Sequence, residues 1–155
     1  IEDKNIIEGI ETYKDIDKRM ELVKTDNFTF IKDCYNASLE STKSALKTLV
    51  NSPKNNKVAF LGDILELGRY SESVHKEIGN FLKTIKIDEI ILVGSEMEYA
   101  YNEAKDVLDV KYYQDKDKLR KDIDEISLEN SLILLKGSRG MEMEKIINFL
   151  SPQKG

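Results

Sequence analysis

The segment Leu132–Ile146, LILLKGSRGMEMEKI, places two cations around a tight turn. An apolar run leads into Lys136, and Arg139 lies between Gly137 and Gly140. Glycines allow the backbone to turn tightly, and the free amides of a following helix can bind an anion to which both cations would add charge. Alternatively, both cations are exposed or pair with the glutamates of that helix. The spacing predicts an anion-binding turn and leaves an ordinary surface turn open.

A second polar segment, KDCYNASLES, begins at Lys32. Asp33 comes where an apolar strand ends, and Tyr35 and Asn36 lie in the loop before a helix. A carboxylate in that place can accept hydrogen bonds from the two hydroxyls of a ribose, and Tyr35 or Asn36 could lie along a base. Alternatively, Asp33 and Asn36 bind only loop amides. The sequence has neither GxGxxG nor GxxxxGK[ST], so no loop that cradles phosphate is predicted in this chain.

In a third segment, LGDILELG, Asp63 and Glu66 lie three residues apart between two glycines. This carboxylate pair could bind an ammonium group or a metal, or it could serve as turn and cap. His75 is the only histidine, which argues against a histidine-rich metal site, and it is expected on the solvent side of a helix. Cys34 has no cysteine or histidine beside it and is expected to be a small buried thiol.

Strand and helix patterns alternate along the chain and must position these motifs. Strands are expected in a hairpin around 25–27 and at 57–62, 89–94, 110–113 and 131–137, and helices at 5–14, 38–50, 71–83, 96–107, 116–126 and 142–150. Ser38 and Ser71 can cap two of the helices.

This alternation predicts an α/β fold, a Rossmann-like and mostly parallel sheet with helices on both faces and an antiparallel edge hairpin. Open sheets of this kind bind ligands beyond the carboxyl ends of the strands. Four segments are expected to lie there: KDCYNAS, LGDILELG, VGSE and LKGSRG.

Composition restricts the class of protein. The 155 residues are 40% hydrophobic and 34% charged, which is typical of one globular domain. A net charge of −5 argues against nucleic-acid binding, and no apolar run approaches the ~20 residues that span a bilayer. The single cysteine fits a reducing compartment, so a cytoplasmic protein is expected.

In order along the chain, DCYNAS, FLGDILELG, a helix with His75 and LLKGSRGMEME resemble the C-terminal domain of the Mur ligases. The resemblance covers residues 1–150 and leaves 151–155 as a tail. The Tyr-Asn-Ala form of the DCYNAS motif favours members that add D-alanyl-D-alanine over those with a Tyr-Ala-His form.

The resemblance implies an ATP-dependent peptide ligase. ATP would phosphorylate the terminal carboxylate of a UDP-N-acetylmuramoyl-tripeptide, and the amine of D-Ala-D-Ala would attack the acyl phosphate. The enzyme's own N-terminal and central domains would be partners, with the phosphate loop and the Mg²⁺ ligands in the central domain. This chain alone is then expected to be inactive. The alternatives are a stand-alone binding or regulatory domain, and a related ligase that adds a single amino acid or glutamates.

The resemblance also implies site residues, with no catalytic residue and no metal ligand in this chain. Nucleotide contacts fall to Arg19, Asp33, Tyr35 and Asn36. Contacts near the amino substrate and the interdomain cleft fall to Asp63, Leu65, Glu66, Lys136, Gly137, Ser138 and Arg139. The chain departs from the family pattern at Lys18, Lys32 and Ser38-Leu39, where a glycine, a second acid and Asn-Pro are usual.

Overall fold

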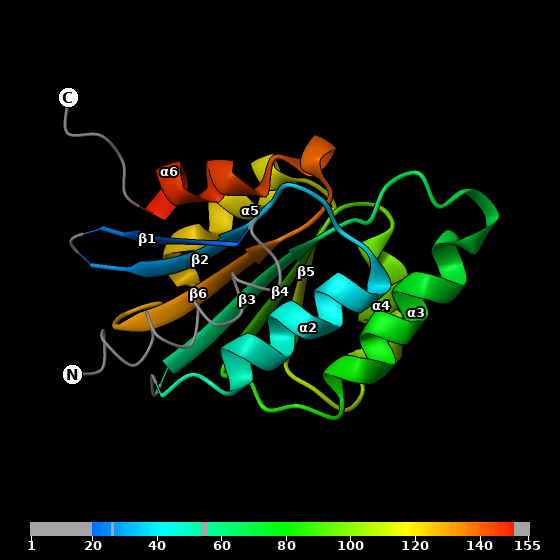
Figure 1. Cartoon of the computed structure of the whole chain (residues 1–155), viewed down its shortest axis with the longest axis horizontal. Helices are drawn as coiled ribbons and strands as arrows, with labels where there is room; N and C mark the ends of the chain where they lie inside the picture. The colour runs from blue at the N-terminus through cyan, green and yellow to red at the C-terminus, as the bar shows by residue number, and fades with distance from the viewer. Residues whose placement is uncertain (1–19, 26, 54–55, 151–155) are drawn as a thin grey trace.

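The sheet has six strands, and all neighbouring strands except one pair run parallel. The computed structural model describes residues 20–25, 27–53 and 56–150. The strand order is β1-β2-β6-β3-β4-β5, and β1 is antiparallel to β2 (Figure 1). This confirms the predicted parallel sheet with its edge hairpin. The strands are β1 (Glu21–Lys24), β2 (Thr29–Asp33), β3 (Asn56–Gly62), β4 (Glu89–Val93), β5 (Val110–Tyr113) and β6 (Ser131–Lys136).

The last strand in the sequence lies inside the sheet. β6 pairs with β2 on one side and β3 on the other, and every one of its residues is buried. A strand covered on both faces loses the usual alternation of polar and apolar residues, which explains the run SLILLK. Consequently the carboxyl end of β6 lies between those of β2 and β3.

Helices cover both faces of the sheet, and each face has its own apolar core (Figure 1). Leu132 and Leu134 of β6 belong to one core, and Ile133 and Leu135 belong to the other, as the two-residue period of a strand requires. The first face carries α2 (Leu39–Val50), α3 (Ser71–Leu82) and α4 (Met97–Ala104), and the second carries α5 (Lys116–Asp122) and α6 (Ile146–Leu150).

Helix α2 begins as the sequence predicts. Ser38 Oγ accepts a hydrogen bond from Ser41 N at 3.0 Å, and Ser41 Oγ accepts one from Ser38 N at 2.9 Å. This reciprocal capping box satisfies amides that the first helical turn leaves free. Ala45, Leu46 and Leu49 then face the core, which confirms the predicted inner face of the helix.

The other helices are shorter than predicted. The predicted cap at Ser71 is wrong, because Ser71 is the first residue of α3 and follows a 3₁₀ turn at Gly68–Tyr70. Helix α5 ends at Asp122 and continues only as a 3₁₀ turn, Ile123–Glu125. The helix expected at 5–14 lies outside the described residues. Within the described ranges, no helix has the length and apolarity to cross a bilayer.

Helices α3 and α4 pack closely at Gly79, which generates a first prediction. A Cβ atom at this position would lie 2.5 Å from Ala100 O, in the backbone of α4. We expect Gly79→Ala to lower the free energy of unfolding by roughly 1–3 kcal/mol, because this overpacking outweighs the gain of about 1 kcal/mol in helix propensity. Urea unfolding measures the change, and Asn80→Ala, on the exposed side of α3, is the control. An unchanged midpoint for Gly79→Ala would show that the two helices separate without loss.

Candidate functional site

The motifs DCYNAS and LLKGSRG meet at the carboxyl edge of the sheet. Asp33 ends β2 and Lys136 ends β6, and the parallel register sets the two residues opposite each other. Lys136 Nζ lies 3.0 Å from Asp33 Oδ2, and both side chains are 1% exposed. The same ammonium group donates a hydrogen bond to Asn36 O at 2.8 Å. Lys136 therefore holds both ends of the segment 33–36.

This placement excludes one of the two sequence interpretations of Lys136. The alternative that Lys136 is exposed or pairs with a nearby glutamate is wrong, because it is buried against Asp33. Glu142 instead pairs with Lys145, at 3.1 Å. Two charges removed from water require each other, since either one alone would remain buried without compensation.

The exposed part of these two loops carries an aromatic ring and a guanidinium group. Arg139 Cζ lies 5.2 Å from the centroid of the Tyr35 ring, a distance suited to a cation–π contact. The Tyr35 side chain is 53% exposed, and Arg139 is exposed as well. Cys34 is 5% exposed, which confirms the expected small buried thiol, and this burial raises the pKa of the thiol to about 12.

The motif LGDILELG is anchored by Asp63. Its Oδ1 accepts a hydrogen bond from Met97 N at 2.8 Å, and its Oδ2 accepts one from Glu96 N at 3.2 Å. The carboxylate thus lies at the first turn of α4, although it comes from the loop after β3. Burial raises the pKa of Asp63, and the two backbone hydrogen bonds oppose that rise. Glu66 is exposed with φ of 64°, so the two carboxylates of the motif have different surroundings.

Ser138 connects the motif LGDILELG to LLKGSRG. Its Oγ accepts a hydrogen bond from Leu65 N at 2.8 Å, and its amide donates to Asp63 O at 3.0 Å. Gly137 permits this approach, because a Cβ atom there would lie 3.1 Å from the Cα of Gly62. The loop after β6 therefore contacts the loops after both β2 and β3.

The predicted helix at 142–150 is wrong in its first half. Two 3₁₀ turns, Arg139–Met141 and Met143–Lys145, follow β6, and α6 begins only at Ile146. Between the turns Glu142 adopts a left-handed conformation with φ of 49°, which interrupts any helix. The free helix amides expected beside the two cations are consequently not there.

A cavity of about 530 Å³ opens at this edge. Its lining combines motif residues with Gly94 and Ser95 of the segment VGSE, which the sequence predicts at this edge, and with residues 114–116 after β5, which the search for motifs missed. The rule that parallel strands bind ligands at their carboxyl ends could have found the latter as well, since β5 ends there too. The lining residues are Asp63, Leu65, Gly94, Ser95, Gln114, Asp115, Lys116, Gly140 and Met141.

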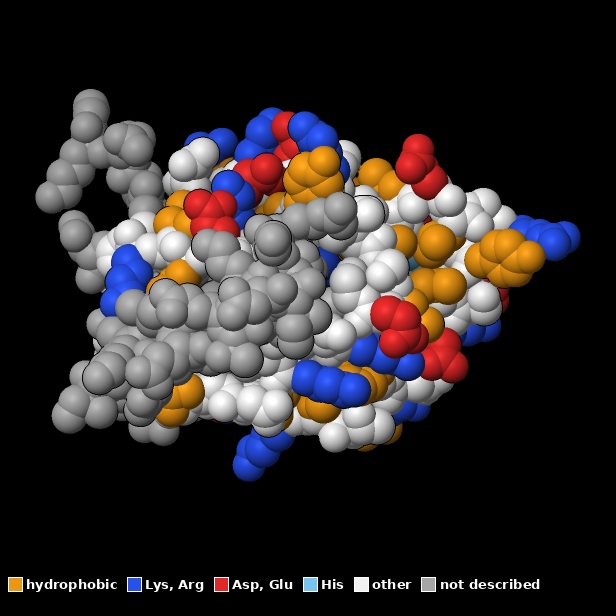
Figure 2. All heavy atoms as spheres, in the orientation of Figure 1, with side chains coloured by type: hydrophobic (Ala, Val, Ile, Leu, Met, Phe, Trp, Pro, Cys, Tyr) orange, Lys and Arg blue, Asp and Glu red, His pale blue; other side chains and the backbone are white. Residues whose placement is uncertain are grey.

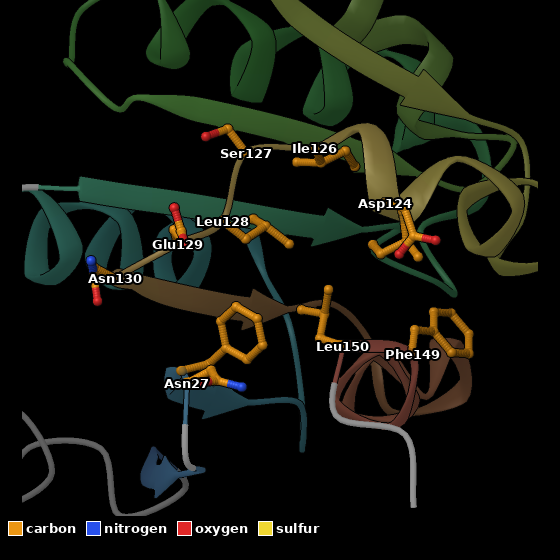
Figure 3. Close-up of a pocket in the computed structure, with 11 residues that line it drawn as sticks. Asn27, Asp124, Ile126, Ser127, Leu128, Glu129, Asn130, Phe149 and Leu150 are labelled. Atoms are coloured by element: carbon orange, nitrogen blue, oxygen red, sulfur yellow. The ribbon is translucent and has the colours of Figure 1, made fainter.

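A larger hollow, of about 660 Å³, lies at the opposite edge of the sheet. Figure 3 shows it between the segment Ile126–Asn130, Asn27 before β2 and Leu150 of α6. It contains no motif residue, so the smaller cavity is the candidate site. No group of three or more His, Cys, Asp or Glu side chains suited to a metal occurs in the part of the chain that the structure describes.

Comparison with known proteins identifies the family of the chain. Residues 18–139 match the family model described as "Mur ligase, glutamate ligase domain". The chain belongs to the Mur ligase family.

Several relatives and solved structures show which Mur ligases are similar. The chain is 36% identical, over 92% of its length, to the UDP-N-acetylmuramoyl-tripeptide–D-alanyl-D-alanine ligase of Bacillus subtilis, and 32% identical over 84% to that of Rickettsia prowazekii. It covers 32% and 29% of those proteins. The structure of MurF from Acinetobacter baumannii superposes with a TM-score of 0.78 and 27% identity, over 87% of this chain and 30% of that one. MurF from Thermotoga maritima in complex with ADP superposes with a TM-score of 0.69 and 25% identity, over 84% of this chain and 30% of that one.

In this Mur ligase domain, the structure brings together most of the residues that the sequence singled out. Asp33, Asn36 and Lys136 form one buried group, and Ser138 joins Asp63 to Leu65 in another. Arg19 lies outside the described residues.

The buried ion pair generates a second prediction. We expect Lys136→Met to lower the free energy of unfolding by roughly 3–5 kcal/mol, because Asp33 is left buried without its counterion. The double variant Lys136→Met/Asp33→Asn should lose much less than the sum of the single variants. Lys32→Met is the control, because the Lys32–Glu21 pair on the neighbouring strands is partly exposed and should contribute less than about 1 kcal/mol. Additive losses in urea unfolding would contradict the coupling.

Proposed function

We propose that residues 1–150 form the C-terminal domain of an ATP-dependent ligase that joins D-alanyl-D-alanine to a UDP-N-acetylmuramoyl-tripeptide, with 151–155 as a tail. The observation that carries the proposal is the meeting of three motifs at the carboxyl edge of the sheet, where LGDILELG and LLKGSRGMEME line one cavity and DCYNAS is joined to the latter by the Lys136–Asp33 pair. The names of the similar ligases support the choice of substrates. The chain spans about a third of the length of those relatives, so the rest of the enzyme would lie in other domains.

On this proposal the nucleotide lies against the loop after β2. Asp33 would accept hydrogen bonds from the ribose, and Tyr35 and Asn36 would line its surroundings together with Arg19. Tyr35 is exposed and can reach a ligand, whereas the Asp33 carboxylate lies against Lys136. Lys136 would then act on the nucleotide by orienting Asp33, and its ammonium group would compensate the buried charge.

The amino substrate lies against the loops after β3 and β6. Leu65 and Gly140 line the cavity, and Arg139 stands exposed beside it with a guanidinium group that matches a carboxylate at two points. The remaining residues assigned to this side shape the loops: Asp63, Glu66, Lys136, Gly137 and Ser138. Leu65 and Tyr70 of the β3–α3 connection are large hydrophobic residues that remain exposed. Figure 2 shows hydrophobic side chains on the surface at the end of the molecule that this connection forms.

The reaction divides between this domain and the rest of the enzyme. ATP supplies the phosphoryl group that activates the tripeptide carboxylate, with Mg²⁺ bound by residues outside this chain. The residues of this domain hold the ribose, hold the dipeptide so that its amine faces the acyl phosphate, and help to exclude water from that reactive group. With a UDP-linked precursor and ATP as substrates, the enzyme would work in the cytoplasm.

The description of the matching family model, a glutamate ligase domain, favours a second candidate, ligation of a different amino component. The complete enzyme decides between the two. With ATP, Mg²⁺ and the UDP-linked tripeptide, it should release phosphate on addition of D-Ala-D-Ala and not of glutamate or a single D-alanine. Preference for glutamate would overturn the choice of substrate.

A third prediction concerns the chain by itself. Residues 1–155 should fold but release no phosphate from ATP with both other substrates present, because the sequence has no phosphate loop. Circular dichroism tests the folding and a coupled phosphate assay tests the activity. Turnover that survives removal of any contaminating enzyme would refute the division between domains.

A fourth prediction separates two roles for Arg139. If it binds the dipeptide carboxylate, Arg139→Ala in the complete enzyme should raise the KM for D-Ala-D-Ala about 10- to 100-fold and leave that for ATP nearly level. Arg139→Lys should rescue only in part, because an ammonium group lacks the planar fork. A fall in kcat at an unchanged dipeptide KM would instead indicate a contact with phosphate. Arg120→Ala, an exposed arginine over the Phe149 ring, is the control. If Arg139→Ala and Arg139→Lys both match the parent in every constant, Arg139 is a surface charge.

A further inference from the structure

His75 is fully buried, so its predicted position on the solvent side of α3 is wrong. Ile64 N donates a hydrogen bond to its Nε2 at 3.1 Å. On the other side of the ring, Nδ1 lies 2.7 Å from Ser71 O. A backbone amide can only donate and a carbonyl oxygen can only accept, so the ring is neutral and carries its proton on Nδ1. Nε2 therefore joins α3 to the loop after β3, and Nδ1 donates to a carbonyl one turn earlier in α3 itself.

The contacts continue from His75 to the first turn of α4. Ser71 Oγ lies 3.2 Å from His75 Nδ1 and donates to Glu96 Oε1 at 2.6 Å. Glu96 N in turn donates to Asp63 Oδ2 at 3.2 Å, and Asp63 precedes Ile64 in the chain. Together with the covalent links within Glu96 and between Asp63 and Ile64, these contacts connect α3, α4 and the loop after β3 in a ring.

Two side chains hold consecutive amides of that loop. His75 accepts from Ile64 N, and Ser138 accepts from Leu65 N. The Ile64 side chain is buried in the core, whereas Leu65 is 39% exposed and lines the 530 Å³ cavity. His75 does not itself line the cavity. It can influence a ligand there only through the conformation of residues 63–65.

We propose that His75 is a positioning residue for the amino substrate. By accepting the Ile64 amide, it fixes the backbone from which Leu65 enters the cavity, and Ser138 fixes the same backbone from the other side. Without an acceptor, the buried Ile64 amide would be left unpaired, a loss that favours movement of the loop. The inference rests on the proposed function, because it takes the cavity as the amino-substrate site.

Substitutions that differ in reach test this role in the complete enzyme. A glutamine at position 75 can place its amide oxygen near the site of Nε2 and accept from Ile64 N, whereas an asparagine reaches only the region of Nδ1. We expect His75→Asn to raise the KM for the amino substrate roughly 5- to 20-fold, as expected for loss of a buried hydrogen bond. His75→Gln should stay within about 3-fold of the parent, and both should leave the KM for ATP nearly level. Ser73→Ala, on the exposed side of α3, is the control.

A purely structural role would give a different pattern. Both variants would then lose active enzyme in proportion to their stability, with equal effects on the two KM values or on neither. Equal dipeptide KM values for the asparagine and glutamine variants, or a shift in the KM for ATP as large as that for the dipeptide, would overturn the proposal.

Hydrogen exchange at the Ile64 amide of the complete enzyme provides a readout that does not depend on activity. Exchange should be slow in the parent, faster in His75→Asn and close to the parent in His75→Gln. If neither variant folds, the parent alone still tests the hydrogen bond between Ile64 N and His75. Exchange of the Ile64 amide at the rate of exposed loop amides would contradict that hydrogen bond and overturn the proposal. The kinetic arm uses whichever amino component the parent accepts. Rejection of D-Ala-D-Ala by the parent would therefore refute the proposed substrate, while equal behaviour of the two variants would refute the role of His75.

Discussion

The buried ion pair between Lys136 and Asp33 is the interaction on which the candidate site depends. Removing either charge from water carries a cost that only its partner offsets. The pairing is possible because β2 and β6 are neighbours in parallel register, so that their last residues lie opposite each other. Since Lys136 also holds Asn36 O, the geometry of the loop after β2 follows from the position of β6.

The loop after β6 has a similar effect on the other half of the site. Ser138 binds the backbone of both Asp63 and Leu65, and Gly137 lets the two loops approach closely. On the opposite side of the β3 loop, His75 holds Ile64 from α3. The residues proposed to contact the nucleotide and those proposed to contact the amino substrate therefore depend on one segment, 136–140, although they come from distant parts of the sequence.

The position of the site follows from topology and not from the size of a cavity. The larger hollow lies at the amino edge of β6, near the C-terminal end of α6 (Figure 3). The smaller one lies where parallel strands end, and there the loops after several strands converge. A domain that presents such an edge can complete a site formed with other domains, which agrees with a chain that spans about a third of its relatives.

Local chemistry was enough to predict much of the fold. The run SLILLK, the hairpin and the capping box at Ser38 depend on residues close in sequence, and each is present. The site motifs were also recognisable, because their order and spacing are properties of the chain itself. What the residues contact was decided by the tertiary structure. Lys136 meets a segment 100 residues away at Asn36, and Asp63 caps a helix that starts 34 residues later. His75 was expected in solvent and is buried, because burial of a polar side chain depends on partners that only packing brings near. The sequence determined which groups could do chemistry, and the order of the strands in the sheet decided which of them meet.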